Sequence, residues 1–257
     1  MQTPARQIPL FPPEELRPEP TGPGKLPGFS VRESARARQL SIKVYPRGRV
    51  EVVVPRRTRP ADVQSFVTEN REWIRRARES FAAQLPPEDY SLPASIALPA
   101  IEQTVQVEYH ERAGAGGVRH RYANGVLSLS GRTGNRELCI QSIRRWLAAT
   151  ARSEFAPLLR SMSRQTGTPY GKLQIRAQRS CWGSRSSSGT LSLNLCLLFL
   201  EPALLRYLML HELCHGRHMN HSKRFWRLVA QFEPDYRRLD RALGESWRQV
   251  PAWLGIY

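Results

Sequence analysis

The chain has 257 residues, 40% of them hydrophobic, and a net charge of +17. This allows one large domain or two small ones with packed cores and a surface that attracts polyanions. No stretch approaches the roughly 18 consecutive apolar residues of a membrane span, and the first residues lack the apolar segment and cleavage site of a secretory signal. Four scattered cysteines without a CxxC pair argue against a disulfide scaffold or a cysteine-rich zinc ribbon, so we expect a cytoplasmic protein.

The N-terminal region begins with a segment that resists folding. Residues 1–28 carry eight prolines and three glycines with little periodicity, which predicts a flexible tail. After it, apolar residues alternate with other side chains at 42–44 and again at 50–54. Arg47-Gly48 lies between the two runs, so the pattern predicts a β-hairpin.

A helix and a second hairpin follow. Pro60 suits the first turn of a helix, and Thr58 is its expected N-cap. Further along, the pair Asn124-Gly125 is a favoured two-residue turn between strands. We therefore expect residues 29–132 to form a β-rich N-terminal part.

Residues 133–257 are expected to be mainly helical. A long helix is predicted from about Arg136, with a kink at Pro157 and its end at Gly167. Two short strands are predicted next, at 172–177 and 190–195. A helix is predicted at 201–216, and a second helix begins after Ser222, its expected N-cap. Strands with a helix, then more strands, then mostly helices predict the α+β class.

The sequence His211-Glu212-Leu213-Cys214-His215 is a candidate metal site. Residues four apart on a helix lie on one face, so His211 and His215 can turn ring nitrogens to the same ion. Glu212 would lie beside that ion rather than on it, where a carboxylate can take a proton from water. Neutral imidazoles suit Zn²⁺. A five-residue motif also occurs by chance on core helices.

Two later histidines compete to be the third ligand. His218 lies on the same helical face as His211, but about 10 Å further along the axis unless the chain bends at Gly216. His221 lies just before the predicted N-cap of the next helix, at a corner from which a side chain can swing back. We favour His221 and place His218 on the substrate side.

Two segments carry a resemblance to a known family. They read QRSCWGSRSSSGTLSLNLCLLFLEP and HELCHGRHMNHSKRFW. They resemble the YgjP-like bacterial metallopeptidases, which are related to SprT-like zinc proteases, some of which process DNA-bound proteins. The resemblance extends from about Val31 to Leu239. It implies a zincin-like metallopeptidase part in residues 133–257, with His211, His215 and His221 as zinc ligands and Glu212 as general base.

The loop before the last predicted strand departs from the family pattern. The family usually reads Arg-Trp-Gly-Ser-Cys, whereas this chain has Cys181 and Arg185 at the two ends of the same motif. If the family's arginine positions substrate or a neighbouring strand, Arg179 or Arg185 would have to supply that role here. Trp182 keeps its place, either as a substrate-binding residue or as a packed aromatic.

The strand at 190–195 has two interpretations. In proteases of this general type an exposed edge strand beside the metal helix pairs with the substrate backbone. Ser192 and Asn194 would then face the substrate while the leucines pack inward. The alternative is an ordinary strand within a sheet.

These observations predict a zinc-dependent metallohydrolase that acts on a protein or peptide. One alternative is a nucleotide pyrophosphate hydrolase, which the basic surface would suit, although no Gly-rich phosphate loop or paired acidic magnesium site is present. Another is a nucleic-acid-binding protein with structural zinc, which would need a fourth ligand such as His218 or Cys214. Non-specific contact with nucleic acid is also compatible with catalysis.

Overall fold

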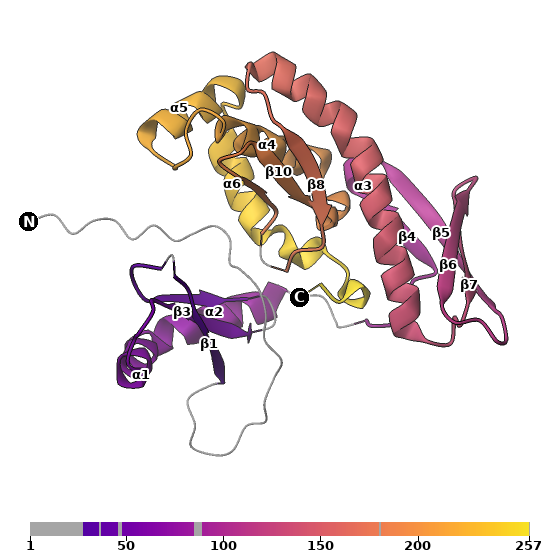
Figure 1. Ribbon diagram of the computed structural model, residues 1–257, viewed down its shortest axis with the longest axis horizontal. Helices are drawn as coiled ribbons and strands as arrows, with labels where there is room; N and C mark the ends of the chain where they lie inside the picture. Colours follow the sequence, from indigo (N-terminus) through magenta and orange to yellow (C-terminus); the bar gives the residue numbers. More distant parts are fainter. Residues whose placement is uncertain (1–27, 36, 46–47, 85–88, 180, 257) are drawn as a thin grey trace, which may run out of the picture. The chain divides into compact units, whose positions relative to one another are not determined.

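The computed structural model describes residues 28–35, 37–45, 48–84, 89–179 and 181–256. The predicted tail therefore lies, apart from Gly28, outside the described residues. The chain divides into two compact units, Met1–Glu88 and Asp89–Ile256, indigo to purple and magenta to yellow in Figure 1. The α+β class is confirmed. The boundary expected near residue 132 falls inside the second unit.

The first unit is a small sheet with two helices. Its strands are β1 (Phe29–Glu33), β2 (Ser41–Val44) and β3 (Val50–Val54), in the order β1-β3-β2. Strand β2 pairs antiparallel with β3, as the hairpin prediction required; Arg47 of the predicted turn lies outside the described residues. The core of the unit is apolar and consists of Val50, Val52, Val54, Val63, Val67 and Ile74.

The helix predicted from Pro60 is two helices, α1 (Pro60–Glu69) and α2 (Arg71–Gln84). Asn70 separates them, and its side-chain amide donates to the carbonyl of Phe66 at 2.7 Å. The predicted cap is wrong. Arg59 occupies the N-cap position, and the hydroxyl of Thr58 donates instead to the carbonyl of Pro55.

The second unit begins with a four-stranded sheet. Its strands are β4 (Ser95–Leu98), β5 (Gln103–Glu111), β6 (Val118–Ala123) and β7 (Val126–Gly131), in the order β4-β5-β7-β6. A short 3₁₀ helix, Pro99–Ile101, joins the first two strands. Asn124 and Gly125 both have positive φ, 50° and 78°, which confirms the predicted tight turn between β6 and β7.

Helix α3 (Arg136–Thr166) joins this sheet to the rest of the unit. Asn135 caps it by accepting from the N–H of Leu138, and Gly167 ends it with a φ of 60°, as predicted. Near its start, Ser142 lies 3.1 Å from a ring nitrogen of His120, and Arg145 donates to the carbonyl of Val118. These contacts with β6 make the sheet part of the second unit.

A second sheet and three helices complete the unit. The strands are β8 (Lys172–Arg176), β9 (Gly183–Arg185) and β10 (Thr190–Asn194), in the order β8-β10-β9. After a 3₁₀ helix, Leu195–Phe199, come α4 (Pro202–Cys214), α5 (Lys223–Phe232) and α6 (Tyr236–Glu245). Two short 3₁₀ helices, Ser246–Gln249 and Ala252–Leu254, end the described chain.

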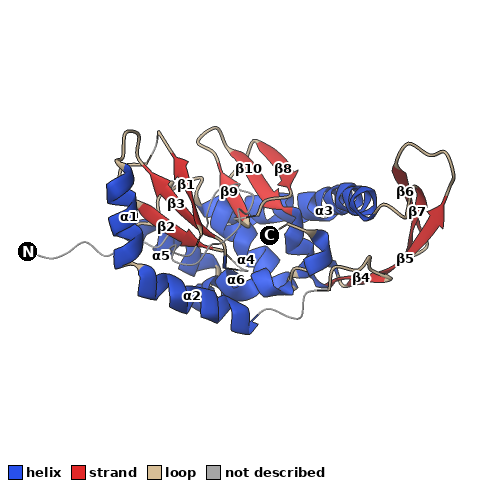
Figure 2. Ribbon diagram, turned by 90° about the horizontal axis from the view of Figure 1, so that it is seen from below, coloured by secondary structure: helices blue, strands red, loops and turns tan. Residues whose placement is uncertain are grey.

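Helix α4 is the most enclosed of these helices. It contacts α3, α5, α6 and β9, and every residue from 207 to 214 is buried. In Figure 2 it lies with α6 below the sheet that contains β9 and β10. Within the described ranges, no helix is both long enough and apolar enough to cross a membrane.

A test of this fold is the end of β7. Gly131 has a φ of 132°, and a Cβ there would lie 2.0 Å from the carbonyl oxygen of Gly117. We expect Gly131→Ala to lower the free energy of unfolding by about 2–4 kcal/mol, because both the backbone and the neighbouring strand must shift. Gly116→Ala, which meets nothing within 4 Å, is the control. Equal denaturation midpoints for the two variants would contradict the described register.

Candidate metal centre

The last turn of α4 places two histidines and a carboxylate in the interior. His211 and Glu212 are each 2% exposed, and His215 is 9% exposed. The preceding turns are apolar, with Leu208, Met209 and Leu210 all buried. Because every residue from 207 to 214 is buried, the polar side chains of the last turn are removed from water.

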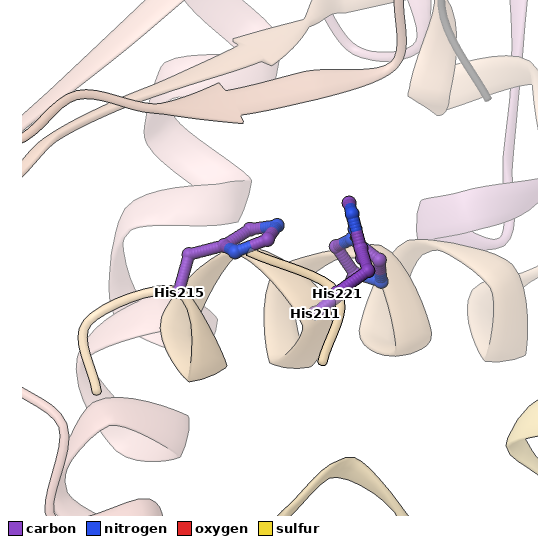
Figure 3. Close-up of side chains that lie close together, drawn as sticks. All are labelled: His211, His215 and His221. Atoms are coloured by element: carbon purple, nitrogen blue, oxygen red, sulfur yellow. The ribbon is translucent and has the colours of Figure 1, made fainter. Parts of the chain in front are cut away.

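A third histidine approaches from the loop after α4. His221 comes directly before Ser222, whose hydroxyl accepts from the N–H of Phe225 and so caps α5. The Nε2 atoms of His221 and His211 are 2.9 Å apart, and one ligand atom from each of His211, His215 and His221 lies within 4.8 Å of the others. Figure 3 shows the three rings gathered on one side of α4.

This arrangement fits a tetrahedral metal ion. Zn–N distances of about 2.0–2.1 Å would separate two ligand nitrogens by roughly 3.3 Å, close to the spacing of the His211–His221 pair. Structural zinc sites normally take four protein ligands, whereas catalytic sites take three and leave one position open. Within the described residues the cluster has three members. The buried Cys214 is not among them.

The environment keeps the three imidazoles neutral, as metal ligands must be. Burial, followed by the nearby His215 and His221, holds the pKa of His211 well below its usual value. Burial also lowers the pKa of His215, against the effect of a hydrogen bond to the carbonyl of His218. Partial desolvation lowers the pKa of His221, which the charge of Asp240 opposes.

Neighbouring groups orient the rings. His215 Nδ1 lies 3.0 Å from the carbonyl oxygen of His218, so this nitrogen carries the proton and Nε2 is free for a metal. His215 stacks on Phe225 with ring centroids 4.6 Å apart, and His221 stacks on Trp226 at 5.5 Å. The loop between α4 and α5, residues 216–221 (the ligand loop), and α5 itself therefore hold the rings of His215 and His221.

Glu212 is the least satisfied polar group of the centre. Its Oε2 is buried without a hydrogen-bond partner among the described residues. Burial raises the pKa of Glu212 to about 8, although the charge of Arg185 opposes this shift. A buried carboxylate with an unpartnered oxygen is unfavourable unless a cation, water or substrate meets it.

Strand β9 lies against this carboxylate. A Cβ at Gly183 would lie 3.1 Å from Glu212 Oε1, so a larger residue there would require the carboxylate to shift. The carbonyl of Trp182 and the N–H of Ser186 bond to β10. By alternation, the main-chain groups of Gly183 and Arg185 point away from β10, to an edge that no other described strand pairs.

Two of the residues expected to bind substrate, Trp182 and Asn194, are fully buried and bonded within the fold. Trp182 is fully buried, stacks on Trp247 at 4.0 Å and donates to the carbonyl of Leu243. Asn194 is fully buried, and its amide group bonds to the main chain of Gln178, Cys181 and Cys196.

The edge-strand interpretation of 190–195 is also wrong. Strand β10 is the central strand of its sheet, so the backbone of Ser192 already faces neighbours on both sides, and the residue is only 8% exposed. His218 is half-buried beside the centre, and its main chain orients His215.

Comparison with known proteins agrees with this geometry. The YgjP-like, metallopeptidase domain family matches residues 38–246. The chain belongs to the YgjP-like family. It is thus a metallopeptidase-family hydrolase, and family membership implies a metal, which the His211, His215 and His221 cluster could bind. No curated protein and no solved structure is significantly similar to it.

Two contacts of this YgjP-like protein were not foreseen from its sequence. They are the packing of Gly183 on Glu212 and of Arg185 on Gly216, a glycine where a Cβ would lie 2.9 Å from the guanidinium carbon. Both glycines could have been taken as signals of close approach, because each adjoins a residue of the proposed site.

Metal content tests the ligand set. We expect His221→Ala to lose the metal that the wild type binds, and His218→Ala to retain it, because the carbonyl that orients His215 survives that substitution. Elemental analysis of the purified proteins measures this. Metal loss from both variants would instead indicate a closed, four-ligand site.

The burial of Glu212 predicts how stability depends on pH in the metal-free protein. A folded-state pKa of about 8, above the ordinary value of about 4.5 for a glutamate, means that the wild type loses stability as pH rises through this interval. Glu212→Gln does not titrate. Its stability relative to the wild type should therefore rise between pH 5 and pH 9 by on the order of a few kcal/mol.

Thermal or denaturant unfolding at the two pH values measures this difference. The three histidines are common to both proteins, so their titration cancels in the comparison. A constant difference across the range would show that the carboxyl group is not desolvated.

Proposed function

We propose that this YgjP-like protein is a zinc-dependent peptidase, with His211, His215 and His221 as the zinc ligands and Glu212 as the general base. The observation that carries the proposal is a buried carboxylate with an unpartnered oxygen beside three convergent neutral imidazoles. Zinc in such a site lowers the pKa of water and polarises a carbonyl group. The remaining steps belong to the protein's own side chains.

Glu212 would perform two proton transfers. It accepts a proton from the water that adds to the peptide carbonyl carbon, and it returns that proton to the amine nitrogen as the C–N bond breaks. The base must start ionised. A cation held by the neighbouring histidines would favour the ionised form and so offset the effect of burial on its pKa.

Strand β9 is the proposed substrate edge, in place of β10. Its outward-facing main-chain groups at Gly183 and Arg185 can pair with an extended peptide, and Gly183 lies directly against Glu212. A peptide paired there would pass over the general base. We place His218 on the same substrate side, as its half-buried position allows.

Two further properties remain proposals. The net charge of +17 supports non-specific contact with nucleic acid, which should weaken as salt concentration rises. The four scattered cysteines, which form no CxxC pair, support a cytoplasmic location. A structural-zinc function is less well supported, because it requires a fourth ligand that the described residues do not bring to the cluster.

Substitution of the base tests the proposed function. We expect Glu212→Gln to bind one equivalent of zinc and to lose peptidase activity by about 10²–10⁴-fold, since it keeps the shape of the side chain but cannot accept the proton. The measurement is cleavage of unfolded protein substrates, with zinc quantified in the same samples. Full activity in this variant would exclude Glu212 as the base.

A further inference from the structure

Strand β9 and the end of α4 meet at two glycines. Gly183 of β9 receives the carboxylate of Glu212, and Gly216, two residues beyond α4, receives the guanidinium group of Arg185. At Gly216 an added Cβ would lie 2.9 Å from both the Cζ and the Nη2 of Arg185. Strand β9 therefore contributes Gly183 and the side chain of Arg185 to the contact, and the end of α4 contributes Gly216 and the side chain of Glu212.

Arg185 also reaches a third element. Its Nη2 donates to the carbonyl of Pro169 at 2.7 Å, in the segment between α3 and β8. One planar group thus joins β9, the end of α4 and the turn after α3. A cation is favourable here, because the last carbonyls of α4 form the negative end of the helix dipole.

The same turn holds the loop that carries the third histidine. Arg217 Nη2 lies 3.3 Å from the carbonyl oxygens of both Thr166 and Gly167. Residues 166–169 are therefore anchored to β9 through Arg185 and to the ligand loop through Arg217. These contacts fix the distance between β9 and the ligand loop.

We propose that Arg185 is a positioning residue that fastens β9 to the end of α4 and so keeps Gly183 against the carboxylate of Glu212. The proposal rests on the proposed role of Glu212 as general base. A packing role alone does not explain a guanidinium group at this position. Its Nη1 is buried without a hydrogen-bond partner among the described residues, which is unfavourable for stability.

The first test does not depend on catalysis. Hydrogen exchange is measured on the metal-free full-length protein at the amides of Ser186 and Asn194, which hydrogen-bond across β9 and β10. We expect Arg185→Met to speed exchange at these amides by about tenfold or more, with β5 and β7 unchanged. Arg176→Met is the matched control, since this exposed arginine of the same sheet bonds, among the described residues, only to the side chain of Gln174.

The second test measures turnover in the zinc-loaded protein. Arg185→Met should lower kcat by about 10- to 100-fold through misplacement of the base and should also raise KM, because the loosened β9 is the proposed substrate edge, while one zinc is retained. Arg185→Lys should recover part of the loss, because an ammonium group can reach Pro169 but cannot lie flat on Gly216. Arg176→Met should match the wild type.

A reverse perturbation uses Gly216. Gly216→Ala places a methyl group into the guanidinium, so it should lower kcat in the same way. Combined with Arg185→Met, it should cause little further loss, because both changes remove one contact. Additive losses would overturn the proposal.

The results separate the two hypotheses. Unchanged exchange at β9 in Arg185→Met overturns the fastening, whatever the protein catalyses. Faster exchange with wild-type kcat overturns the positioning of Glu212. If the wild type shows no turnover that depends on Glu212, the proposed function fails, and the exchange measurement still decides whether Arg185 holds the strand.

Discussion

The removal of the last turn of α4 from water is the constraint on which the rest of the second unit depends. An apolar helix surrounded by α3, α5, α6 and β9 would be ordinary, but this one ends in His211, Glu212 and His215. Burial of ionisable groups without partners is unfavourable by several kcal/mol. A metal ion would offset this, since it binds neutral imidazoles and supplies a cation beside the carboxylate. Metal binding at this cluster would therefore stabilise the fold.

The same constraint explains the neighbours of the centre. His221 is held in place by its stack on Trp226 and by the start of α5 directly after it, rather than by burial. His215 depends on one main-chain carbonyl for its tautomer. Strand β9 has three residues, and its closest contacts with the end of α4 lie at Gly183 and Gly216, where an added side chain would force a shift. Precision at the centre comes from backbone and rings, which move less than long polar side chains do.

The sequence predicted the helices and their caps better than it predicted which elements pack beside one another. Periodicity and capping residues gave α3, α4 and the N-cap at Ser222, because these depend on residues close in sequence. Periodicity is silent about strand order, so it could not show that β10 is central and β9 is the edge. The three-residue β9 is too short to produce a pattern at all. The position of Trp182 shows the same limit, since an aromatic beside a catalytic motif can equally belong to the core.

Helix α3 adds a restriction of a different kind. Its 31 residues span about 46 Å, with β6 fastened near one end and the two arginine contacts beyond the other. One inserted residue would rotate everything after it by about 100° and turn the carbonyls of residues 166–169 away from Arg185 and Arg217. The exposed face of α3 is free to vary in composition, whereas its length is fixed. Among relatives, alignment gaps should therefore gather in the loops and leave this helix uninterrupted.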